Sequence, residues 1–395
     1  MTEVDGLRAV RAARLFDGER LHTDHPVVLV REGKVVAVDS GRVDLSAVDV
    51  TDLGDVTLVP GLVDAHAHLT FDPQGDVARQ SVEDSAEVLL DRIRRNARSA
   101  LSSGVTTIRD LGDRDYLSLQ VRDEAAPDLP EILCSGPPLT RRRGHCWFLN
   151  GEAEPGLELE SAIDEHVARG VDVIKIMATG GVITPGWTPY ESQYSTDDLR
   201  VVVERAQRHG LPVTAHAHGA EGVAACVDAG VGGVEHASFL SSTGVSVDER
   251  AVAALAASGT FVGVASARLP ADRPLSALFQ AVGRAFARQH QAGVRLVCSS
   301  DAGISPEKPF TCLPYGVVDF RDVIGMTDEE ALRAATSIAA DSCHIGHRKG
   351  RIRAGFDADL LAVSGNPVAD VRALLEPVAV YRAGVIVVGE PQPSR

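Results

Sequence analysis

The stretch Leu62-Val63-Asp64-Ala65-His66-Ala67-His68-Leu69 places two histidines, two residues apart, at the end of an apolar run. Side chains on a strand alternate between its two faces, so residues two apart point to the same side. His66 and His68 therefore direct their imidazoles toward one point, and neutral imidazole is a common ligand for zinc and similar metals. Two surface histidines at a strand end are the alternative, so a metal site requires further ligands elsewhere in the chain.

Residues 56–346 alternate apolar strands with helices, several of which end at a glycine. The strands are apolar on both faces, as expected for parallel strands covered by helices. Eight strands, each followed by a helix, predict an α/β fold of the (β/α)₈ TIM barrel type. The predicted strands cover 56–69, 104–111, 131–136, 171–179, 211–217, 231–237, 260–266 and 294–300.

The two ends of the chain have β character without a helical period. Val27–Val30 and Val35–Val38 flank a four-residue loop, which predicts a hairpin. Short β segments recur after residue 346. We expect residues 1–55 and 347–395 to form one composite β-sandwich domain beside the barrel of residues 56–346.

Active sites of such barrels lie at the C-terminal ends of the strands. Beyond the first strand, these ends carry His216 and His218, His236 and Asp301 on the fifth, sixth and eighth strands. Lys175 lies within the apolar fourth strand, where burial of a lone ammonium is costly, and it is one of only four lysines in the chain. Each residue alone has a structural explanation, but together they predict a metal site.

This set resembles the amidohydrolase superfamily, and more narrowly its binuclear prolidase-like and imidazolonepropionase-like members, which include Xaa-Pro or Xaa-Arg dipeptidases and N-acyl amino acid hydrolases. The motifs are His-x-His after the first strand, Lys on the fourth, His on the fifth and sixth and Asp on the eighth, and the resemblance covers nearly the whole chain. It implies two divalent metal ions, of which zinc suits histidine and carboxylate ligands. The implied ligands are His66, His68 and Asp301 for one ion, His216 and His236 for the other, and Lys175, carboxylated by CO₂, as a bridge.

The resemblance also implies a reaction: hydrolysis of an amide or peptide bond, in a dipeptide or N-acyl amino acid, by a metal-bridging hydroxide. Asp301 would accept a proton and pass it to the leaving amine.

The loops after the strands are expected to contact the substrate, and the residues involved are His145 and Arg143, Trp187 and Tyr190, and His218 beside the ligand His216. For Arg143 and the neighbouring arginines, the alternative explanation is a solvated loop. For Trp187 and Tyr190, it is a packed lid. Arg109 and Asp110 are expected to form a structural ion pair or to anchor a ligand.

Three other functions stay open at this point. A mononuclear deaminase or a cyclic amide or imidazolone hydrolase of the same superfamily would need no bridging lysine. A non-catalytic scaffold typically loses ligands, whereas this chain keeps all six candidate positions. A cysteine hydrolase built on His145-Cys146 lacks an orienting third group, and adjacent loop residues rarely face each other.

The composition of the chain argues against several classes of binding partner. The net charge of −16 argues against nucleic acid and anionic membrane surfaces. No stretch approaches the roughly 20 apolar residues of a membrane span, and the first residues contain no apolar run. Six cysteines without a paired spacing predict free thiols in a reducing compartment. We expect a cytoplasmic protein that acts on a small molecule without a nucleic-acid or membrane partner, and a homo-oligomer is its expected assembly.

Overall fold

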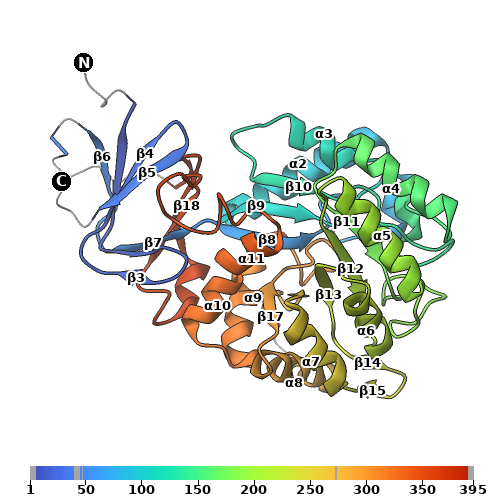
Figure 1. Ribbon diagram of the computed structural model, residues 1–395. Helices are drawn as coiled ribbons and strands as arrows, with labels where there is room; N and C mark the ends of the chain where they lie inside the picture. Colours follow the sequence, from blue (N-terminus) through green and yellow to red (C-terminus); the bar gives the residue numbers. More distant parts are fainter. Residues whose placement is uncertain (1–5, 40–44, 47, 272–273, 390–395) are drawn as a thin grey trace.

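The computed structural model describes residues 6–39, 45–46, 48–271 and 274–389, and Figure 1 shows a barrel of strands and helices beside a β region. Eight parallel strands run in the orders β10-β9-β8 and β11-β12-β13-β16-β17. Two bridges join these groups, Leu139 with Ile176 and Ala67 with Ala302, and so confirm the predicted (β/α)₈ barrel. The strands are β8 (Leu62–Ala67), β9 (Val105–Asp110), β10 (Glu131–Cys134), β11 (Ile174–Met177), β12 (Val213–Ala217), β13 (Gly233–His236), β16 (Phe261–Val264) and β17 (Arg295–Cys298).

The helices surround the ring of strands and pack an apolar face against it (Figure 1). Capping boxes begin two of the helices: Ser195 with Asp198 begins α5, and Thr327 with Glu330 begins α10. In the described ranges, no helix is both long and apolar enough to cross a membrane. The helices are α1 (Val77–Glu83), α2 (Ala86–Ser102), α3 (Leu117–Asp123), α4 (Leu157–Arg169), α5 (Thr196–Arg208), α6 (Ala220–Asp228), α7 (Glu249–Ser258), α8 (Ala277–Gln291), α9 (Leu313–Asp319), η2 (Phe320–Ile324), α10 (Asp328–Ala334) and α11 (Ser337–Ser342).

Strands from both ends of the chain form the β region beside the barrel (Figure 1). One sheet has the order β5-β4-β1-β6 and the other β20-β19-β18-β7-β2-β3, and one apolar core lies between them. The predicted hairpin is confirmed as the antiparallel pair β4 and β5. The strands are β1 (Arg8–Arg11), β2 (Arg14–Phe16), β3 (Leu21–His22), β4 (Val27–Arg31), β5 (Lys34–Asp39), β6 (Asp49–Asp52), β7 (Val56–Pro60), β18 (Leu360–Ser364), β19 (Pro377–Arg382) and β20 (Val385–Val388).

The single strand predicted over 56–69 is wrong, because the structure has two strands there in different sheets. β7 pairs with β18 and β2, whereas β8 pairs with β9. Both strands are buried along their whole length, so the apolar run continues across the turn. The apolar pattern therefore does not show where the first strand ends and the second begins. Gly61 makes the turn against Thr106, whose side chain would lie only 2.1 Å from an added Cβ.

A buried ion-pair network connects the barrel to the C-terminal segment. The ammonium of Lys349, whose side chain is 2% exposed, lies 3.2 Å from Glu131 Oε2 and 3.1 Å from Asp357 Oδ2, and it also contacts Asp359. Glu131 begins β10, whereas the two aspartates precede β18. Burial disfavours the ionised carboxyl, but Lys349 and its neighbours hold the pKa of Asp357 at about 2. A second lysine, Lys34, contacts the same Asp357 from an exposed position.

We expect Lys349→Met to lower the free energy of unfolding by about 3 kcal/mol, because it removes the fully buried cation that Glu131, Asp357 and Asp359 share. Among the residues that the structure describes, these carboxylates then keep only more exposed cations, Arg348, Arg382 and Lys34. Lys34→Met is the matched control, since it removes an exposed cation from the same acceptor, and it should cost no more than about 1 kcal/mol. Chemical denaturation of both variants measures the difference. Equal losses would show that the buried network does not hold the two regions together.

Candidate metal centre

Three ligand atoms from β8 and the end of β17 converge on one point. The Nε2 atoms of His66 and His68 lie 3.3 Å apart, and they lie 3.5 and 3.3 Å from Asp301 Oδ1. A tetrahedral ion with bonds of about 2.0–2.1 Å has ligand atoms about 3.3 Å apart. The three atoms therefore already have the spacing of a coordination sphere.

The hydrogen bonds of the two imidazoles fix which nitrogen carries the proton. His66 Nδ1 donates to Glu235 Oε2 at 3.0 Å, and His68 Nδ1 donates to the carbonyl oxygen of Gly112 at 3.3 Å. The Nε2 lone pairs therefore face each other and the Asp301 carboxylate. Burial, with the nearby charge of Lys175, lowers the pKa of His66 to about 4, so this ring is neutral at pH 7. Three such acceptors repel one another unless a cation lies among them.

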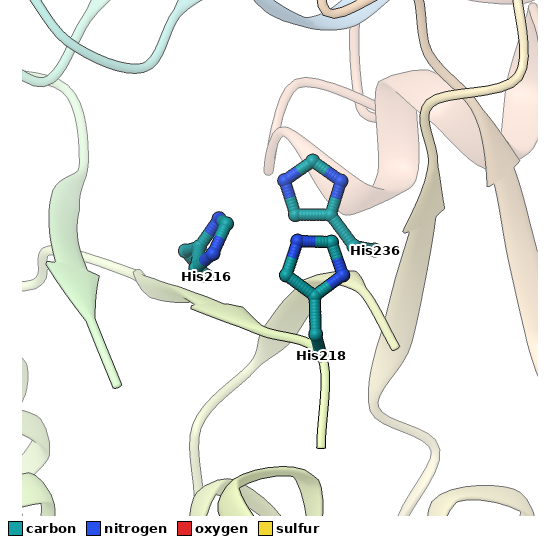
Figure 2. Close-up of side chains that lie close together, drawn as sticks. All are labelled: His216, His218 and His236. Carbon is teal, nitrogen blue, oxygen red and sulfur yellow. The ribbon is translucent and has the colours of Figure 1, made fainter. Parts of the chain in front are cut away.

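A second cluster contains His216, His218 and His236, whose ligand nitrogens lie within 4.8 Å of one another. Figure 2 shows the three rings close together at the ends of β12 and β13. His216 Nε2 donates to the carbonyl oxygen of Gly180 at 3.0 Å, which leaves Nδ1 as the ligand atom. His218 Nδ1 bonds Ser238 Oγ at 2.7 Å, which leaves Nε2. Burial lowers the pKa of each of the three imidazoles, to about 4 for His218, so the rings are neutral donors to a metal.

Lys175 lines the same small cavity as both clusters. Its side chain is 1% exposed, and Nζ has no hydrogen-bond partner among the described residues. Burial lowers the pKa of Lys175 to about 8, against the opposing charges of Glu235 and Asp301, so more of the amine is neutral than in water. A buried amine without a partner requires explanation. A neutral amine can add CO₂, and the resulting carbamate would offer an oxygen to each of two ions, so the residues present fit the implied binuclear centre.

The backbone is strained at two of the candidate ligands. His236 has φ 75° and Asp301 has φ 53°, both in the left-handed region that non-glycine residues seldom adopt. Such positions cost roughly 1–3 kcal/mol and cluster at functional sites. The amide of Asp301 donates to the carbonyl oxygen of His66 at 2.7 Å, so the eighth strand end is tied to the first.

Two buried carboxylates that orient the ligands were missed in the sequence. Glu235 accepts from His66, from Arg109 Nη2 at 3.1 Å and from Thr214 Oγ1 at 2.7 Å, and these contacts outweigh burial and hold its pKa far below the ordinary value. Asp64 accepts from the amide of Ser300 at 3.0 Å, beside Asp301. An acidic residue inside an otherwise apolar strand is the signal that marks both.

The expected ion pair between Arg109 and Asp110 does not form. Neighbouring residues on β9 point to opposite faces, so Arg109 reaches Glu235 while Asp110 accepts from the amides of Leu69 and Gly112 and from Ser118. Arg109 therefore supports the candidate ligand His66 through Glu235.

The predicted substrate contacts fall into two groups. His145 is buried, its ring centroid lies 4.5 Å from that of His216, and it lines the ligand cavity with His218. Among the described residues that line this cavity, Arg143, Trp187 and Tyr190 are absent, and Val182, Ile183 and Ile304 lie there instead. Arg143 and Tyr190 are exposed, so the roles of these three residues stay predictions.

The cysteine-hydrolase alternative has no support in this geometry. Burial raises the pKa of Cys146 to about 12, so its thiol stays protonated. The ring of His145 packs against His216.

Comparison with known proteins agrees with this geometry. The model of the Amidohydrolase family matches residues 57–387. Ochratoxinase from Aspergillus niger is 28% identical over 92% of this chain and 82% of its own length, and imidazolonepropionase from Deinococcus deserti is 26% identical over 95% and 94%. The crystal structure of a prolidase complexed with N-methylphosphonate-L-proline has a TM-score of 0.86 at 25% identity, covering 97% of this chain and all of that one. This chain belongs to the amidohydrolase family and is a metal-dependent hydrolase that acts on carbon–nitrogen bonds.

Proposed function

We propose that the protein hydrolyses the amide bond of a dipeptide or N-acyl amino acid at a centre of two divalent metal ions, with zinc as the expected metal. The observation that carries this proposal is the convergence of His66 Nε2, His68 Nε2 and Asp301 Oδ1, three buried acceptors within 3.5 Å of one another. The second histidine cluster lines the same cavity and supplies ligands for a second ion.

The ions, when bound, would acidify a water molecule and polarise the scissile carbonyl. Burial opposes the ionisation of Asp301, but the contacts with His66 and His68 hold its pKa well below the ordinary value, so the group is a carboxylate at neutral pH. In the proposed reaction this carboxylate takes a proton from the attacking water. Asp301 then delivers that proton to the leaving amine nitrogen. His145, buried beside His216, would orient the substrate carbonyl.

Lys175 favours amide hydrolysis with two ions over the chemistry of a mononuclear deaminase. As a free ammonium it would be a buried charge without a hydrogen bond, whereas as a carbamate it becomes a bridging anion. The structural similarity to a prolidase also supports a peptide-like substrate. The relative named imidazolonepropionase favours a second candidate, hydrolysis of a cyclic amide at the same centre.

We expect Asp301→Asn to lower kcat by about 10²–10⁴ on a panel of Xaa-Pro dipeptides and N-acetyl amino acids, because the amide cannot take up the proton. Product formation followed by liquid chromatography, with metal content determined on the same samples, separates proton transfer from metal loss. Asp91→Asn, on the surface of α2, is the control and should retain activity. Near-normal turnover of Asp301→Asn with full metal content would contradict the assigned role.

We expect Glu235→Gln to weaken metal affinity about 10- to 100-fold, because the carboxylate fixes the proton on His66 Nδ1 and makes Nε2 a better ligand. Competition with a chromogenic chelator measures the affinity. Thr214→Val, which removes one hydrogen bond to the same carboxylate, should have a smaller effect. If folded Glu235→Gln bound metal as tightly as the unmodified protein, Glu235 would not support the centre.

A further inference from the structure

The cavity at the candidate ligands is too small for a dipeptide. Its volume is about 40 Å³, whereas small-molecule sites usually have about 300–1,000 Å³. A second cavity of about 460 Å³ includes His236 in its wall, so one candidate ligand borders both spaces. This volume is within the usual range for small-molecule sites.

The larger cavity lies at the C-terminal ends of three barrel strands. Ser238 follows β13, Ser266 follows β16 and Ser305 follows β17, while α8 and η2 complete the wall. Substrates of barrel enzymes bind at this end. The sequence pointed instead to the loops after the third and fourth strands.

The walls of this cavity are mainly apolar. Phe279 is 56% exposed, an unusual position for a large aromatic side chain, and it lines this cavity together with Phe286. Such surface contributes about 25 cal/mol per Å² when an apolar group covers it. The other large apolar residues of the wall are Leu275, Val282, Val323 and Ile324.

The charged residues of the wall do not give it a net charge. They are two cations and two anions: Arg268, Lys308, Glu307 and Asp319. Lys308 Nζ donates to the carbonyl oxygens of Ala265 and Ser300 at 2.8 and 2.7 Å. The Arg268 guanidinium lies 5.0 Å above the Phe279 ring and 3.9 Å from Asp319. Selection in this cavity therefore depends on apolar contact.

We propose that this cavity is the specificity pocket for a large apolar side chain, branched aliphatic or aromatic, on one side of the scissile amide. The inference rests on the proposed function and narrows it to dipeptides or N-acyl derivatives of large apolar amino acids. Phe279 and Val323 form the selecting wall.

Two readouts test the pocket. Hydrolysis of N-acetyl-L-leucine and N-acetylglycine gives a ratio of kcat/KM, and calorimetric titration of the metal-free full chain with each compound measures binding without turnover. We expect a leucine preference of about 100-fold or more, since each buried methylene contributes about a factor of ten. Phe279→Ala should reduce this preference about tenfold in both readouts, and Val323→Trp should reduce it by filling the space. Leu278→Ala, on the same helix at similar exposure but outside the wall, should leave it unchanged.

The two readouts separate the pocket from the reaction. Selective binding of N-acetyl-L-leucine that Phe279→Ala weakens, without hydrolysis of either compound, would support the pocket and overturn the proposed function. Equal binding of the two compounds, or a preference that both wall variants retain, would overturn the pocket even if both were hydrolysed.

Discussion

Burial of neutral imidazoles around an ionised carboxylate is the constraint on which the rest of this structure depends. His66, His68 and Asp301 turn lone pairs toward one another inside the barrel, an arrangement that is unfavourable without a cation. Residues outside the set of candidate ligands stabilise this arrangement. Glu235 accepts the proton of His66, and Arg109 neutralises Glu235 while it also binds the carbonyl oxygen of Ala65. The orientation of the candidate ligand His66 thus depends on residues that are not themselves candidate ligands.

The barrel strands hold the strained backbone at two of the candidate ligands in place. The left-handed backbone at His236 and Asp301 is held by a strand on each side and by hydrogen bonds between strand ends. Lys349 and its three carboxylates attach the barrel to a β region built from both ends of the chain. The small cavity at the ligands then suits water and ions, and the larger cavity beside His236 suits the substrate.

The barrel and the convergence of the candidate ligands could be predicted from the sequence because both depend on local periodicity. Strands with apolar runs, each followed by a helix, specify the barrel, and His or Asp at a strand end then points into its mouth. The division of residues 56–69 between two sheets could not be predicted in this way, because β7 and β8 are equally apolar although they belong to different sheets. The pairing of Arg109 with Glu235 depends on residues 126 positions apart, which no local pattern reveals.

The apolar cavity was missed for a related reason. Its wall combines Ser266 and Phe279 with η2 residues, and nothing in their separate sequence contexts indicates that they meet. Trp187 and Tyr190 were expected to contact the substrate because aromatic residues make up only 4% of this chain. Side chains that line a cavity are determined by the packing of helices on the barrel, and composition does not show this.

The most direct test of this account is the number of metal ions per chain, measured by mass spectrometry on protein prepared with zinc and bicarbonate. The account predicts two ions in the unmodified chain and loss of one in Lys175→Ala, because the neutral amine of Lys175 would then no longer be available to form the bridging carbamate. A single ion in the unmodified chain, unaffected by Lys175→Ala, would contradict the binuclear centre and favour a mononuclear mechanism. No bound ion after reconstitution would contradict the proposed hydrolysis altogether.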